Sequence, residues 1–113
     1  MNDFDSFINQ VAFNADGLVP VVAQDATTKD VLMLAWMNAD ALRLSLETGR
    51  GTYFSRSRSK LWVKGEESGH VQHVVDIRND CDSDALVMTV RQYGPACHTG
   101  NQSCFFNIVV VDS

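Results

Sequence analysis

Residues 17–49 read GLVPVVAQDATTKDVLMLAWMNADALRLSLETG, and this stretch decides the fold. It contains two apolar runs rich in β-branched residues, at 17–24 and 31–37, with a polar segment between them. Two such runs joined by a turn predict an antiparallel hairpin. Asn38 is a favourable N-cap after the second run, and Gly49 is placed to end a helix. The stretch therefore predicts a hairpin followed by a helix.

Short strand-like segments follow this helix and are separated by Gly, Ser, Asn or Pro. They lie at 52–58, 61–64, 71–78, 85–92 and 105–111, and residues 94–103 are predicted to form a loop. One principal helix with many short strands predicts an α+β fold with a mainly antiparallel sheet. A chain of 113 residues is long enough for one compact core and too short for two. We therefore expect a single domain spanning residues 1–113.

Composition narrows the possible environments and partners. Hydrophobic residues make up 45% of the chain and charged residues 20%, a balance typical of soluble globular proteins. The net charge of -5 opposes binding to nucleic acid, and no apolar run approaches the roughly 20 residues that cross a bilayer. Residues 1–10 carry two Asp where a signal peptide would carry Lys or Arg. We expect a cytoplasmic protein with neither nucleic acid nor membrane as a partner.

The densest group of possible metal ligands is an acidic segment in which Asp80, Asp82 and Asp84 alternate with Cys81 and a serine. An extended backbone would point the three carboxylates to one side and the thiol to the other. Carboxylate oxygens suit Mg²⁺, whereas a thiolate suits Zn²⁺. The segment lacks the turn glycine and the closing glutamate of an EF hand. The alternative to two metal sites is a solvated acidic turn between strands.

Three cysteines offer a second group of ligands. Cys97 and Cys104 share one glycine-bounded loop, and Cys81 lies sixteen residues before Cys97. Structural zinc sites use four ligands in close pairs, whereas three thiolates leave one position for an activated water. His98 could transfer a proton or complete the zinc shell. The alternatives are buried apolar cysteines, or a redox pair between Cys97 and Cys104, which lack the C-x-x-C spacing.

A basic segment, SRSRSKLWVKGEESG at 55–69, supplies candidates for substrate binding. In an extended conformation Arg56 and Arg58 would project to the same face, and Lys64 follows on the same segment. Guanidinium groups bind phosphate oxygens bidentately, so a phosphorylated substrate is expected. A basic edge strand that opposes aggregation is the alternative. Trp36 and Trp62 could stack on a base or belong to the core.

Four segments taken together resemble the phosphoribosyl-AMP cyclohydrolase family. They are LAWMN at 34–38, SRSRSKLWVKGEESG at 55–69, DCDSDAL at 80–86 and GPACHTGNQSCF at 94–105. The resemblance covers roughly residues 17–106, and the length and order of the segments make it more specific than any single motif. The chain looks like the monofunctional form of this family.

The resemblance implies hydrolysis of the N1–C6 bond of the purine in phosphoribosyl-AMP, a step of histidine biosynthesis. It also implies a homodimer with shared Zn²⁺, in which one subunit supplies Cys81 and the other supplies Cys97 and Cys104. Two arginines match a substrate with two phosphates.

The resemblance further implies that Mg²⁺ is held by Asp80, Asp82 and Asp84, and His98 is our candidate for proton transfer. Two other classes stay open. A small zinc-stabilised interaction domain would use the same cysteines and His98 as a closed shell. A nucleotide deaminase would use the same activated water, but the H-x-E signature of zinc deaminases is absent.

Overall fold

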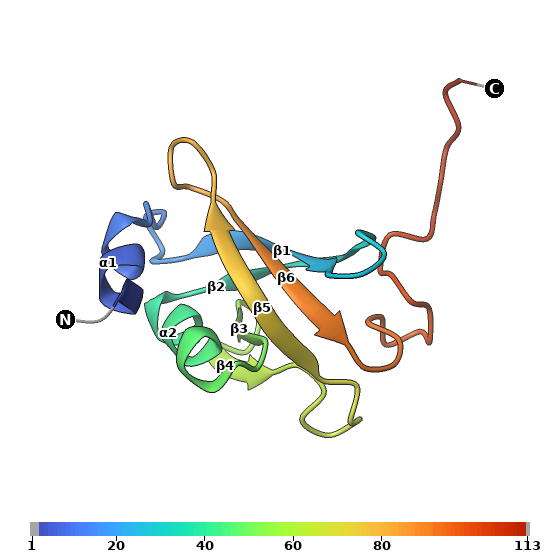
Figure 1. Cartoon of the computed structure of the whole chain (residues 1–113), viewed down its shortest axis with the longest axis horizontal. Coiled ribbons are helices and arrows are strands. Elements are labelled where there is room, and N and C mark those ends of the chain that lie inside the picture. The colour runs from blue at the N-terminus through green and yellow to red at the C-terminus, as the bar shows by residue number, and fades with distance from the viewer. Residues whose placement is uncertain (1–2, 113) are drawn as a thin grey trace.

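The computed structural model describes residues 3–112. In this part of the chain two helices and six strands follow one another (Figure 1): α1 (Asp3–Gln10), β1 (Val19–Asp25), β2 (Val31–Met37), α2 (Ala39–Thr48), β3 (Thr52–Ser55), β4 (Lys60–Val63), β5 (Gln72–Asn79) and β6 (Leu86–Gln92). The predicted α+β class is confirmed. Within residues 3–112, neither helix is long and apolar enough to cross a membrane.

The strands form two sheets. The larger is a four-stranded sheet in the order β2-β1-β6-β5, and β3 and β4 form a separate antiparallel ribbon. β1 pairs with β2 and β5 with β6 in antiparallel fashion, which confirms the predicted hairpin, whereas β1 and β6 are parallel. The sheet is therefore mixed. A residue pattern does not reveal which distant strands pair, so the parallel contact at the centre was not predicted.

Helix α2 begins and ends where its capping residues predict. Asn38 Oδ1 accepts a hydrogen bond from the Ala41 N–H at 2.8 Å. At the other end Gly49 has a left-handed φ of 73° and donates its N–H to the Ser45 carbonyl at 3.1 Å. This cap needs a residue that tolerates positive φ, which is the property of glycine. The helix buries Leu42 completely.

The prediction of one principal helix was incomplete, because α1 also forms. Its apolar residues Phe4, Phe7 and Ile8 follow helical spacing, and Ile8 is buried. Asp5 accepts a hydrogen bond from the guanidinium of Arg43 in α2 at 2.6 Å. A helix of eight residues is marginal in isolation, so its stability depends on this docking.

The predicted strand at 105–111 is wrong: the described residues after 104 contain neither helix nor strand. This segment runs away from the body of the molecule in an extended course (Figure 1). Its composition favours a strand, but a strand also needs a neighbour for its backbone hydrogen bonds.

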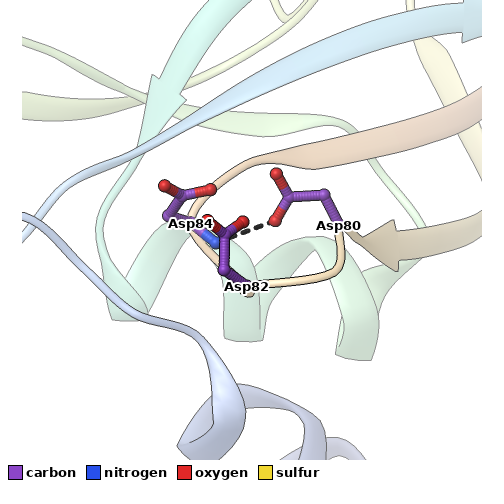
Figure 2. A group of neighbouring side chains, drawn as sticks. All are labelled: Asp80, Asp82 and Asp84. Atoms are coloured by element: carbon purple, nitrogen blue, oxygen red, sulfur yellow. Dashed lines mark hydrogen bonds between the residues drawn. The ribbon is translucent and has the colours of Figure 1, made fainter.

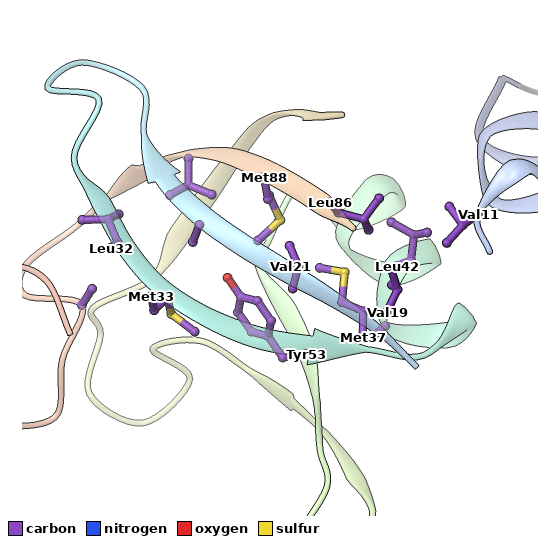
Figure 3. Packing of buried hydrophobic residues seen from close by; sticks show 14 of the residues in the cluster. Val11, Val19, Val21, Leu32, Met33, Met37, Leu42, Tyr53, Leu86 and Met88 are labelled. Carbon is purple, nitrogen blue, oxygen red and sulfur yellow. The ribbon is translucent and has the colours of Figure 1, made fainter. Parts of the chain in front are cut away.

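The core lies between the four-stranded sheet and the elements that pack against it, which are α1, α2 and the β3–β4 ribbon. Alternate residues of β1 are buried, among them Val19 and Val21, as expected for a strand with one face in the core. Met37, Leu42 and Tyr53 bring β2, α2 and β3 into the same cluster (Figure 3). This packing fixes the β3–β4 ribbon, which carries the basic segment, against the sheet.

Candidate functional site

The acidic segment forms a turn between β5 and β6, as in the second of the two conformations considered, and not an extended backbone. The Ser83 N–H donates to the Asp80 carbonyl at 3.1 Å, and Ser83 has a positive φ of 62°. The turn still gathers Asp80, Asp82 and Asp84, whose nearest carboxylate oxygens lie within 4.8 Å of one another (Figure 2). An extended strand would keep Asp80 and Asp84 roughly 13 Å apart, so it is the turn that brings the three carboxylates together.

The electrostatics of this turn fit a hard cation. Side-chain hydrogen bonding to Asp82 and then to Asp80 raises the pKa of Asp84. The Asp84 N–H also donates to Asp80 Oδ1 at 3.0 Å, which holds the two residues in place. Three carboxylates this close repel one another, and a divalent cation with oxygen ligands would relieve that repulsion.

Residues 94–103 contain no helix or strand, which confirms the predicted loop, and backbone hydrogen bonds organise this loop and Cys104, which follows it. The Cys97 N–H donates to the Asn101 carbonyl at 3.1 Å and the Gly100 N–H donates to the Cys97 carbonyl at 3.0 Å. The Cys104 N–H donates to the Leu32 carbonyl of β2 at 2.7 Å. These bonds fold the loop back so that its two cysteines approach each other.

The two loop thiols form a pair of soft ligands. All three cysteines of the chain are free. The Thr99 hydroxyl donates to Cys97 Sγ at 3.1 Å and lowers the pKa of Cys97. Burial, followed by the neighbouring Cys97 thiol, raises the pKa of Cys104. Each thiol thus shifts the pKa of the other. Two adjacent sulfurs, of which that of Cys97 is favoured as a thiolate, are suitable ligands for Zn²⁺. Thr99 was missed by sequence reasoning, although its position two residues after Cys97 was a usable signal.

The structure does not bring Cys81 to the other two thiols within one chain. Cys81 is exposed in the acidic turn before β6, whereas Cys97 follows β6. The two segments lie at opposite ends of this strand (Figure 1). At roughly 3.3 Å per residue, a strand of this length separates them by about 20 Å. Among residues 3–112, Asp80, Asp82 and Asp84 form the one group of three or more His, Cys, Asp or Glu side chains whose possible ligand atoms lie within 4.8 Å of one another.

A pocket of about 310 Å³ lies beside the loop thiols. Its lining includes Lys64, His70, Cys97 and His98. The Lys64 ammonium donates to the carbonyl of Ala96, directly before Cys97, so Lys64 joins the end of the β3–β4 ribbon to the loop. His98, our proton-transfer candidate, is exposed at this pocket. The structure therefore brings Lys64, His98 and two of the three thiols together.

The basic segment contains a turn at 56–59, so the expected extended arrangement of its arginines is wrong. The Arg56 guanidinium lies over the Trp36 ring at 4.6 Å from the centroid, and both residues line a pocket of about 520 Å³ with Trp62. Arg58 lines other pockets, on the same turn. The two arginines therefore do not project into one common pocket.

Lys64 connects this aromatic pocket to the thiol pocket. Its ammonium lies 5.9 Å from the centroid of the Trp62 ring while it bonds to the loop carbonyl. Trp36 and Trp62 are both half-buried, so each has ring surface facing the pocket. A cation and aromatic faces next to two thiols can bind a nucleotide through stacking and phosphate contacts.

A buried polar chain beneath the thiol pocket was also missed, because no sequence motif marks it. The Tyr53 hydroxyl donates to Gln72 Oε1 at 2.5 Å, and Gln72 Nε2 donates to Gln92 Oε1 at 2.9 Å. Gln92 Nε2 then donates to the carbonyl of His70 at 3.0 Å. Tyr53 and Gln72 are fully buried. This chain of hydrogen bonds ties β3, β5 and β6 to the wall of the pocket.

Comparison with known proteins points to one family. A family model described as phosphoribosyl-AMP cyclohydrolase matches residues 33–106. The chain is 62% identical over 97 residues to the phosphoribosyl-AMP cyclohydrolase of Roseobacter denitrificans, covering 86% of this chain and 76% of that protein. The protein of the same name from Ruegeria pomeroyi is also 62% identical over 97 residues, covering 86% and 82%. For that of Azoarcus sp., identity is 56% over 113 residues, covering 99% and 86%.

Proposed function

The chain belongs to the phosphoribosyl-AMP cyclohydrolase family, and we propose that it hydrolyses the N1–C6 bond of the purine in 1-(5-phosphoribosyl)-AMP during histidine biosynthesis. The match over residues 33–106 carries this proposal, because every candidate ligand and substrate-binding residue lies inside it. We expect the reaction to take place in the cytoplasm.

We propose that Zn²⁺ is held by three cysteines at the interface of a homodimer. One subunit supplies Cys81, and the other supplies Cys97 and Cys104. The adjacency of the two loop thiols supports a soft-metal site. The separation along β6 supports sharing, because one chain would have to unfold β6 to bring Cys81 to the loop. When bound, zinc supplies Lewis acidity that makes a water nucleophilic near neutral pH.

The three carboxylates of the acidic turn, from Asp80, Asp82 and Asp84, are proposed to hold Mg²⁺. Their convergence within 4.8 Å and the raised pKa of Asp84 support this assignment. Cys81 lies inside the same turn, so a dimer that shares zinc would also bring this Mg²⁺ site next to the thiol pocket of the other subunit.

The remaining roles concern proton transfer and substrate orientation. His98 is proposed to move a proton to or from the ring nitrogens, since its imidazole borders the pocket next to Cys97. Arg56 and Arg58 are proposed to bind the two phosphates of the substrate separately, one at each side of the turn at 56–59. Lys64 has N–H donors beyond the one that bonds to Ala96 and is proposed to bind the substrate between the two pockets.

The first test is the ultraviolet change when the purified chain, with Zn²⁺ and Mg²⁺, is mixed with phosphoribosyl-AMP. We expect turnover by the wild type and none by Cys97→Ser. His98→Ala should lower kcat by about 100-fold or more while zinc stays bound, the usual scale for general acid–base catalysis. His73→Ala, an exposed imidazole on β5, is the matched control and should turn over like the wild type. A folded, zinc-loaded wild type without turnover would overturn the proposed function.

Subunit sharing has its own test, in which Cys81→Ser chains are mixed with Cys97→Ser chains. Each variant alone should be inactive, whereas a mixed dimer can assemble one intact zinc site from the unmodified cysteines. Subunit exchange is followed by mass spectrometry of the intact dimers. Complete exchange without recovery of activity would argue against a shared site.

A further inference from the structure

The segment at 105–111, which reads FFNIVVV, is an apolar feature that the proposed reaction does not use. Six of its seven side chains are exposed and apolar, and Ile108, Val109 and Val111 are 81%, 86% and 95% exposed. The segment extends away from the rest of the chain (Figure 1). A contiguous exposed apolar surface of this kind marks an interaction site.

The residue types of this segment favour a strand. Four β-branched residues follow one another at 108–111, and this run is why the sequence predicts a strand there. In residues 3–112 the segment has no place in either sheet. A strand becomes stable only when another strand satisfies its backbone donors and acceptors. The segment is therefore a strand that lacks its neighbour within the described chain.

The root of the segment lies at the β2 edge of the sheet, where the Cys104 N–H donates to the Leu32 carbonyl and the edge beyond Leu32 has no strand neighbour in residues 3–112. Strand β2 is an edge strand, and the Ser103 hydroxyl donates to its Val31 carbonyl at 2.6 Å. The side chains of Val31 and Leu34 are 44% and 50% exposed. The opposite edge strand, β5, exposes Val75 at 45% but also exposes the charged residues Asp76 and Arg78. Of the two edges, β2 offers the better surface for an apolar strand.

We propose that residues 105–111 form an arm that binds a second copy of this chain, where they lie along the β2 edge near Val31 and Leu34. This inference rests on the homodimer of the proposed function. Cys104, the residue directly before the arm, is a proposed ligand of the shared zinc, so the arm begins at the subunit interface. In a twofold dimer the same contact would form twice, because each subunit offers one arm and one edge.

The test is the dimer dissociation constant, measured by sedimentation velocity of the full chain with Zn²⁺ and Mg²⁺. Ile108→Asp/Val110→Asp changes the arm, and Leu34→Asp changes the edge that receives it. Each should weaken the dimer by at least about 100-fold, the scale of losing a buried apolar contact at an interface. Leu44→Asp, an exposed apolar position on α2, is the matched control and should leave the constant unchanged. Circular dichroism checks that each variant folds.

Combining the arm and edge changes distinguishes direct contact from independent effects. The triple variant combines Ile108→Asp/Val110→Asp with Leu34→Asp. If the arm lies on the edge, its dimer dissociation constant should rise by less than the product of the two separate fold-increases, because both changes remove the same contact. Arm variants that dimerise within about threefold of the wild type, or a wild type that stays monomeric at every concentration, would overturn the inference. Turnover by the wild type is measured in the same samples, so a tight dimer without turnover would refute the proposed reaction and leave the arm standing.

Discussion

The buried hydroxyl of Tyr53 offers a sharp test of how the pocket is supported. Tyr53→Phe removes the donor to Gln72 Oε1 and keeps the ring in the core. Gln72 is fully buried, and its amide nitrogen already donates to Gln92, so the carbonyl oxygen would lose its partner without gaining access to water. A buried acceptor left unpaired costs about 1–3 kcal/mol. We therefore expect a loss of about 2 kcal/mol in the free energy of unfolding.

The assay is urea unfolding followed by circular dichroism, at one fixed protein concentration because a dimer would make stability concentration-dependent. For a chain of this size the loss corresponds to a fall in Tm of roughly 6–12 °C. Tyr93→Phe is the matched control, since Tyr93 is 55% exposed. If the free energies of unfolding of Tyr53→Phe and Tyr93→Phe differed by less than about 0.5 kcal/mol, the buried chain of hydrogen bonds would not support the pocket.

Three further perturbations test the fold and the site. Leu42→Ala, at a fully buried position of α2, should lower the free energy of unfolding by about 2–5 kcal/mol in urea titrations. Asp25→Ala should cost about 1 kcal/mol at neutral pH, because the carboxylate accepts the backbone N–H of Thr28, the main cause of its lowered pKa. The stability difference between the wild type and Asp25→Ala should shrink as the pH falls below 3.8, the ordinary pKa of an aspartate. It should vanish once the pH is below the lowered pKa of Asp25 in the folded chain, because the carboxylate is then protonated in both states. Lys64→Met should weaken zinc binding in chelator competition, because the loop loses its tie to the ribbon, whereas Lys60→Met should not.

Local patterns in the sequence predicted most of the elements that carry the site. The β1–β2 hairpin and α2 formed as expected because alternation, an N-cap and a C-terminal glycine act over a few residues. The carboxylates of the acidic segment converge for the same reason, since Asp80 and Asp84 are close in sequence and a turn is enough to join them. The family resemblance was likewise readable in the motifs and is confirmed by the family match.

Other features depended on contacts between residues far apart in the chain. The parallel pairing of β1 with β6 at the centre of the larger sheet joins strands far apart in the chain, and no local pattern encodes it. A turn at 56–59 replaced the end of the predicted strand at 52–58, and it separated the pockets of Arg56 and Arg58. The buried Tyr53–Gln72 pair formed because packing brought β3 against β5.

The sequence by itself determined the residue chemistry of the site, because ligand type, charge and short-range turns are properties of neighbouring residues. Only the tertiary structure decided that Cys97 and Cys104 lie together and that Lys64 joins the ribbon to their loop. The physical reason is that strand order sets distances across the molecule. That order follows from burial of the whole core, to which residues distant in the chain contribute jointly.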